Sequence, residues 1–148
     1  MKILLLYRPT DEGHAALKAA RLEARLREAT VLVARHVKLE GEKAPIADVP
    51  TQHAAPRETR SGQDVSKLRE DLDSVAQDLR SSGIESEPFL VTDTSDPGKA
   101  LLELARQQEV GLIVMGLRRR SPVGKLIMGS TSQEILLHAD CPVLAVKA

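Results

Sequence analysis

The sequence predicts an α/β fold: a single domain built on an open, parallel, five-stranded sheet with helices on both faces. Two observations predict it. Short apolar or β-branched runs alternate with longer segments of helical periodicity, which is typical of a parallel sheet covered by helices. The chain has 148 residues, 42% of them hydrophobic and 28% charged, which is the size and composition expected of one soluble domain spanning residues 1–148.

The first strand and the first helix are predicted from the N-terminal residues. Residues 3–7 are an apolar run, which predicts a strand buried on both faces. Thr10 and Asp11 are both suited to cap the helix that follows. That helix is expected to end near Ala29, and its apolar side chains recur at helical spacing: Ala15, Ala19, Leu22 and Leu26.

A second strand and a long loop come next. Residues 30–37 are rich in β-branched side chains and predict the strand. Residues 39–62 lose this pattern because Pro45, Pro50 and Pro56 interrupt it, so we expect a long surface loop. Two roles stay open for the loop, a plain connector and a lid or partner contact.

Two further helices and a third strand are predicted in the middle of the chain. Gly83 is suited to end the first of these helices, and residues 87–92 predict the strand. Asp96 followed by Pro97 is typical of the start of the second helix. The first helix has a clear apolar stripe: Val65, Leu68, Leu72, Val75, Ala76 and Leu79.

The C-terminal part predicts two strands and a helix between them. Residues 112–115 form the fourth strand and residues 143–147 the fifth. Thr131 and Glu134 have the spacing of a capping box for a helix that runs to about His138.

The expected ligand site lies at the carboxyl ends of the strands, at the point where the strand order reverses. The loops after the first and fourth strands, residues 8–13 and those from Gly116 onward, should meet there. The second loop has the layout of a phosphate cradle. An apolar strand leads into Gly116, a basic run 118–120 follows, and Gly129 then precedes the hydroxyl residues Ser130 and Thr131.

These residues also resemble a known family. Gly116-x2-Arg119-x9-Gly129-Ser130 resembles the G-x2-G-x9-G-(S/T) signature of the universal stress protein family, and residues 132–147 are similar to that family's C-terminal helix and strand. The resemblance covers nearly the whole chain outside residues 40–62. It implies a nucleotide-binding-like fold with the strand order 3-2-1-4-5.

The resemblance also implies a conditional site for a nucleotide or anion, with ATP or AMP as the candidate ligand. In ATP-binding members the glycines and hydroxyl residues hold the ribose and phosphates, and a valine backbone at the end of the second strand faces adenine. The positions that this assigns are Arg8, Val37, Met115, Gly116, Arg119, Gly129, Ser130 and Thr131.

Two departures from the family pattern argue against ATP. Arg8 stands where those members carry an acid that contacts adenosine, and a guanidinium offers donors but no acceptor. Arg119 replaces the middle glycine, where a side chain would occupy ligand space. The alternative is that Arg8, Arg118, Arg119 and Arg120 face one phosphate or acidic ligand, because arginine binds phosphate in a bidentate way.

The last strand predicts a homodimer. It is an apolar strand at a sheet edge, which needs a cover, and the family resemblance implies pairing with the same strand of a second copy. The interface residues are Val143, Leu144, Ala145 and Val146. The alternative is a monomer whose short edge strand is protected by Lys147.

Composition and motifs exclude several classes of function. The formal charge is zero and the aromatic residues are Tyr7 and Phe89 alone, so neither nucleic acid nor membrane is an expected partner. One cysteine, Cys141, and no apolar leader or span predict a cytoplasmic protein without an internal disulfide. The four histidines show no metal-ligand spacing, and no serine lies in a nucleophile elbow.

We therefore expect a small stress-response or regulatory module that acts as a homodimer, with a protein partner and without catalysis. The second hypothesis is an ATP or AMP sensor with a modified cradle. A slow ATPase ranks last, because the sequence places no general base.

Overall fold

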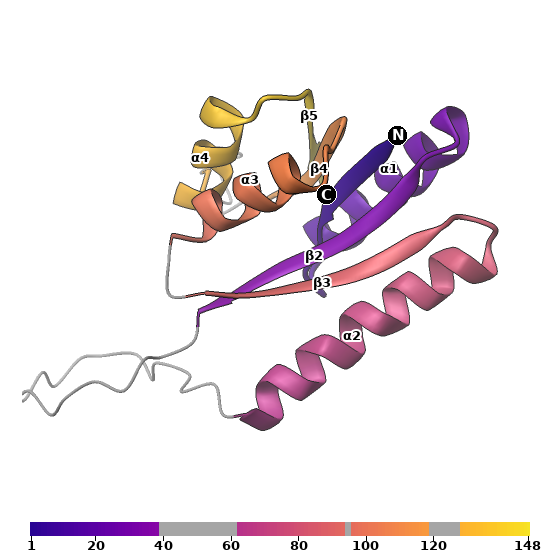
Figure 1. Ribbon diagram of the computed structural model, residues 1–148, viewed down its shortest axis with the longest axis horizontal. Coiled ribbons are helices and arrows are strands. Elements are labelled where there is room, and N and C mark those ends of the chain that lie inside the picture. Colours follow the sequence, from indigo (N-terminus) through magenta and orange to yellow (C-terminus); the bar gives the residue numbers. More distant parts are fainter. Residues whose placement is uncertain (39–61, 94–95, 119–127) are drawn as a thin grey trace, which may run out of the picture.

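The computed structural model describes residues 1–38, 62–93, 96–118 and 128–148. They form one five-stranded parallel sheet in the order β3-β2-β1-β4-β5, as predicted (Figure 1). The elements in chain order are β1 (Lys2–Leu6), α1 (Asp11–Arg27), β2 (Thr30–Lys38), α2 (Gly62–Ser81), β3 (Ser86–Asp93), α3 (Pro97–Gln107), β4 (Leu112–Leu117), α4 (Ser130–His138) and β5 (Val143–Lys147).

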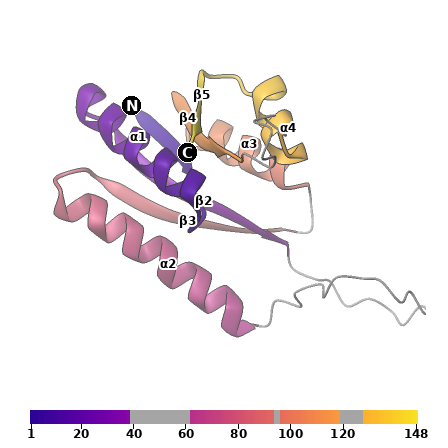
Figure 2. The same cartoon turned by 180° about the vertical axis from the view of Figure 1, so that it is seen from behind.

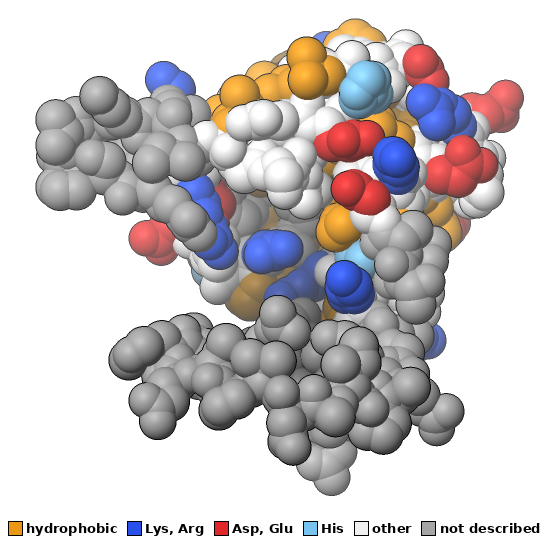
Figure 3. Space-filling view, turned by 90° about the vertical axis from the view of Figure 1, so that its left-hand side faces the viewer, with side chains coloured by type: hydrophobic (Ala, Val, Ile, Leu, Met, Phe, Trp, Pro, Cys, Tyr) orange, Lys and Arg blue, Asp and Glu red, His pale blue; other side chains and the backbone are white. Residues whose placement is uncertain are grey.

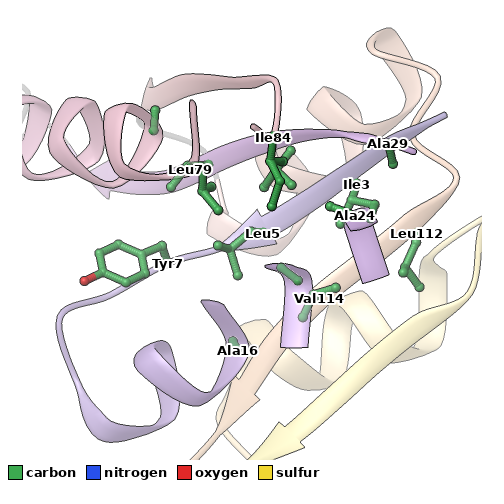
Figure 4. Close-up of a cluster of buried hydrophobic side chains, with 14 of the residues drawn as sticks. Ile3, Leu5, Tyr7, Ala16, Ala24, Ala29, Leu79, Ile84, Leu112 and Val114 are labelled. Atoms are coloured by element: carbon green, nitrogen blue, oxygen red, sulfur yellow. The ribbon is translucent and has the colours of Figure 1, made fainter. Parts of the chain in front are cut away.

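Two hydrophobic layers cover the sheet. Helices α1 and α2 pack on one face, and α3 and α4 pack on the other (Figures 1 and 2). Successive residues of β1 point to opposite faces of the sheet. Ile3 and Leu5 belong to the hydrophobic cluster on the α1 and α2 face (Figure 4), and Leu4 belongs to the cluster on the other face. All three are fully buried, which confirms a strand buried on both faces.

Helix α1 starts where the sequence predicted but buries a different face. Thr10 is the N-cap, and its side chain accepts a hydrogen bond of 3.2 Å from the amide of Gly13. The leucine stripe is not the buried face, because Leu22 is 58% exposed and Leu26 is 71% exposed. Small residues face the sheet instead, namely Gly13, Ala16, Ala20 and Ala24. Small side chains let the helix axis approach the strands closely, and spacing alone does not indicate which flank will do so.

Helix α2 follows the predicted stripe, with Leu72, Ala76 and Leu79 buried. It ends at Ser81, and Gly83 adopts the left-handed conformation expected after a helix, with φ of 84°. The predicted loop 39–62 lies outside the described residues except for Gly62, which is already the first residue of α2.

The two C-terminal helices test two predicted caps. Asp96 caps α3, where its Oδ1 accepts a 2.9 Å hydrogen bond from the Gly98 amide. The capping box at Thr131 was wrong. Helix α4 begins two residues earlier than that box requires, at Ser130, with Gly129 as an N-cap that makes no side-chain hydrogen bond. Thr131 is therefore already helical, and Glu134 packs against Gly98 of α3.

Candidate functional site

A cavity of about 310 Å³ opens at the carboxyl ends of β1, β2 and β4, where the sequence placed the site. Basic side chains and a histidine surround a hollow on this face of the molecule (Figure 3). The cavity has walls from both sides of the sheet, because α1, α3 and α4 all contribute. The lining residues are Leu6, Tyr7, Arg8, Thr10, Glu12, Gly13, Ala34, Arg35, His36, Pro97, Leu101, Met115, Gly116, Leu117, Arg118, Met128, Gly129, Ser130, Thr131, Ser132 and Ile135.

The turn between β1 and α1 forms one wall of the cavity. Its backbone folds back tightly, with the Thr10 amide donating to the Arg8 carbonyl at 2.8 Å. A Cβ on Gly13 would lie 1.8 Å from that carbonyl oxygen, so only glycine fits there. This packing places Arg8 at the cavity beside the first turn of α1.

Gly116 allows α1 to approach β4 closely. The sequence predicted that the strand ends at Met115, before this glycine. Strand β4 instead runs through Gly116 to Leu117, so the glycine lies within the strand. A Cβ on Gly116 would lie 2.3 Å from the carbonyl oxygen of Glu12. The fold therefore requires glycine at position 116, whatever the cavity binds.

At position 129, no contact with the described residues requires glycine. Its φ of −67° suits any residue, and none of the described atoms lies within 4 Å of a Cβ placed there. It precedes α4, whose first turn carries Ser130, Thr131 and Ser132 at the cavity. The missing side chain leaves room beside the uncapped amides of a helix start, which is the arrangement that binds phosphate in other proteins.

An ion pair closes one side of the cavity. The Nε atom of Arg118, just after β4, donates to the Oε1 atom of Glu12 in α1 at 3.1 Å. Burial works to raise the pKa of Glu12. Hydrogen bonds to its own amide, to Arg118 and to Thr10, together with the charge of Arg118, outweigh burial and lower the pKa. Glu12 is thus an anion at neutral pH.

A polar group lies on the α1 and α2 side of the cavity. Tyr7 is 7% exposed, and its ring centroid lies 6.1 Å from that of His14. Burial raises the pKa of the Tyr7 hydroxyl, the charge of Asp71 in α2 raises it further, and Arg35 opposes both. Tyr7 is therefore a neutral hydrogen-bonding group at the cavity.

The structure brings most of the predicted site residues together. Arg8, Met115, Gly116, Gly129, Ser130 and Thr131 line the cavity. Val37 is 1% exposed and is not a lining residue, because β2 continues past the end of β1 and pairs there with β3 alone. Arg119 and Arg120 lie outside the described residues.

Sequence reasoning missed Glu12 and Arg35 and assigned no role to His36, yet all three line the cavity. The one signal in the sequence that could have assigned these residues to the site was their position after or near the end of a predicted strand. Groups of three or more His, Cys, Asp or Glu side chains that could hold a metal do not occur in the described ranges. None of the helices in those ranges is long and apolar enough to cross a membrane.

Comparisons of the sequence and of the structure with known proteins point to the same family. The model of the "Universal stress protein family" matches residues 1–147. A universal stress protein of Mycolicibacterium smegmatis is 31% identical over 147 residues, covering 98% of this chain and 96% of its own length. A universal stress protein structure from Archaeoglobus fulgidus is 27% identical with a TM-score of 0.76, over 99% of this chain and 97% of that one. An Archaeoglobus fulgidus structure in complex with dAMP is 22% identical with a TM-score of 0.71, over 99% of this chain and 96% of that one.

Proposed function

We propose, from the premise that this chain belongs to the universal stress protein family, that it is a cytoplasmic stress-response module that acts as a homodimer without catalysis. We further propose that its cavity does not hold ATP in the family's usual way. The observation that supports this most is Arg8 at the cavity wall, where the family resemblance expects an acid. A guanidinium cannot accept the hydrogen bonds that adenosine would donate to a carboxylate.

The electrostatics of the cavity argue against catalysis. A general base works best when its pKa lies near the working pH. Glu12, the one carboxylate among the described lining residues, has a lowered pKa and is engaged by Arg118. A carboxylate of this kind is a weak base at neutral pH.

A second candidate function is a sensor for a small phosphate-bearing ligand such as AMP. Gly129 favours it, because the fold of the described residues gives no other reason for a missing side chain beside the start of α4. The volume of about 310 Å³ is at the low end for ligand cavities, which suits a small ligand. The complex of the Archaeoglobus fulgidus protein with dAMP involves a ligand of this size.

Calorimetric titration of ATP-Mg, AMP and inorganic phosphate into nucleotide-free protein separates the two candidates. Heat with AMP or phosphate but little with ATP-Mg supports the sensor, and no heat with any ligand supports the interaction module. Saturable micromolar binding of ATP-Mg to the wild-type protein would overturn the proposal that the cavity does not hold ATP in the family's usual way. The variant carrying Arg8→Asp and Arg119→Gly should gain ATP binding, and Arg25→Gln, an exposed position on α1, serves as the control.

The homodimer is supported by the position of exposed apolar side chains. Strand β5 is an edge of the sheet, and Val143 to Val146 are all only partly buried. Of the described leucines, isoleucines, valines and phenylalanine, the exposed ones are Leu22 and Leu26 of α1 and Leu136 and Leu137 of α4. Monomeric proteins rarely expose apolar side chains in groups.

The first leucine pair lies on α1, a helix that contacts β5, and the second lies on α4, which packs against α3. On α1, Arg21 pairs with Asp78 of α2, and helical geometry places Leu22 and Leu26 on the flank that faces away from α2. On α4, Glu134 faces α3, so Leu136 lies on the opposite flank. Since α1 contacts β5, Leu26 on the flank away from α2 lies toward this edge of the sheet. A second copy related by a two-fold axis would cover β5 and this flank of α1.

Light scattering after size exclusion tests the dimer. Leu22→Glu with Leu26→Glu should give a monomer at concentrations where the wild-type protein is a dimer. Lys18→Gln with Arg25→Gln changes the net charge equally on exposed positions of the same helix, and it should remain a dimer. A monomeric wild-type protein would overturn the proposal.

A further inference from the structure

Glu12 is the unusual group in a cavity that is otherwise basic. Among the described residues that line the cavity, it is the one acid, whereas three arginines line the same space. An acid there repels the phosphate that the basic side chains would attract. Acids are favoured in the first turn of a helix, and α1 has Asp11 and Glu12 there, but of these two only Glu12 lines the cavity.

The backbone holds Glu12 in place. The carbonyl group of Glu12 lies against the Cα atom of Gly116, so β4 fixes the first turn of α1. The carboxylate accepts a 3.1 Å hydrogen bond from Nε of Arg118, and hydrogen bonds to its own amide and to Thr10 help to lower its pKa. Its side chain is 20% exposed, compared with 48% for Arg118. Glu12 is therefore a fixed charge, and Arg118 is the more solvent-exposed partner of the pair.

We propose that Glu12 is a specificity-determining residue, a resident counter-anion that competes with the phosphate of a ligand for Arg118. The inference rests on the second proposed function, a phosphate-bearing ligand in the cavity. The ligand's phosphate binds Arg118 by displacing the carboxylate, and the charge of Glu12 sets how strongly anions bind. An uncharged ligand in the same cavity does not meet this competition.

The test compares charged and uncharged ligands across matched variants. AMP, inorganic phosphate and adenosine are titrated into the wild-type protein, Glu12→Gln and Asp11→Asn, each shown to be folded by its thermal transition. Asp11→Asn removes one charge from the same helical turn at a residue that does not line the cavity. It is the matched control for a change in net charge alone.

Glu12→Gln should bind AMP and phosphate roughly two- to fivefold more tightly, the scale expected for releasing one partly exposed ion pair. Adenosine affinity should stay unchanged, and Asp11→Asn should alter AMP binding by less than about twofold, because exposed charges are screened. Adding Arg118→Gln to Glu12→Gln should abolish the gain. If Glu12→Gln does not fold, Glu12→Asp retracts the carboxylate from Arg118 and should give a smaller gain in the same direction.

Wild-type binding of AMP that Glu12→Gln leaves unchanged would overturn the inference and leave the sensor hypothesis standing. An equal gain for adenosine would also overturn it, because the effect would then be steric. No binding of AMP or phosphate by any folded variant would overturn both the inference and the sensor hypothesis.

Discussion

Substitution of Gly116 by alanine tests whether the signature glycine serves the fold. The new Cβ would lie 2.3 Å from the carbonyl oxygen of Glu12 and 2.6 Å from its carbonyl carbon, where ordinary contact begins near 3.4 Å. Helix α1 or strand β4 must therefore move by about 1 Å, and both are packed against a buried layer. Overpacking of this kind costs about 1–3 kcal/mol, and the gain from replacing a strand glycine offsets about 0.5–1 kcal/mol of it.

Because the closest atoms are backbone and cannot give way as a side chain can, we expect the upper end of this range, a net loss of about 2 kcal/mol, which lowers the melting temperature by roughly 4–8 °C for a domain of this size. Thermal unfolding followed by circular dichroism, with urea midpoints as a second measure, gives the value. Gly129→Ala is the control, because its backbone φ of −67° is ordinary and its Cβ would meet no described atom within 4 Å. That control should stay within about 1 kcal/mol of the wild-type protein. A Gly116→Ala protein as stable as Gly129→Ala would refute the close-approach argument.

Two further predictions follow from the pKa shifts. Because the pKa of Glu12 is lowered on folding, its stabilisation is present above its ordinary value of 4.5 and is lost as pH falls through the folded value. The urea midpoint of Glu12→Gln should thus lie below that of the wild-type protein near neutral pH, with a gap that closes in acid; a gap independent of pH would contradict the assignment. Burial, and then the charge of Asp140, raise the pKa of the Cys141 thiol, so iodoacetamide should label it more slowly in folded than in urea-unfolded protein. Equal labelling rates in the two states would contradict a half-buried, inert thiol.

The order of strands and helices could be predicted from the sequence because each element has its own pattern of apolar residues and end signals within a short stretch of chain. Residues 3–6 of β1 are all apolar, and Asp96 followed by Pro97 marks a helix start without reference to the rest of the chain. The position of the cavity also followed, since parallel strands bring their carboxyl ends to one edge.

Local patterns failed where a choice depended on distant packing. Helix α1 carries a leucine stripe and a stripe of small residues, and only contact with the sheet selects the second. The Glu12–Arg118 pair joins residues 106 positions apart, so no local spacing could indicate it. The capping box failed for a smaller reason. It requires the first residue of α4 to be known, and helix starts differ by a residue or two among equally good patterns.

The two signature glycines therefore carry different information. Gly116 would be needed in this fold even if the cavity were empty of function, because α1 could not otherwise reach β4. A glycine that matches the family signature at position 116 therefore indicates a shared fold and gives no information about ligand binding. Gly129 has no such constraint among the described residues, and Glu12 adds a negative charge to a cavity whose other charged side chains, among the described lining residues, include three arginines. Substitutions at Gly129, Glu12 and Arg8, which all line the cavity, are therefore more informative about binding than a substitution at Gly116.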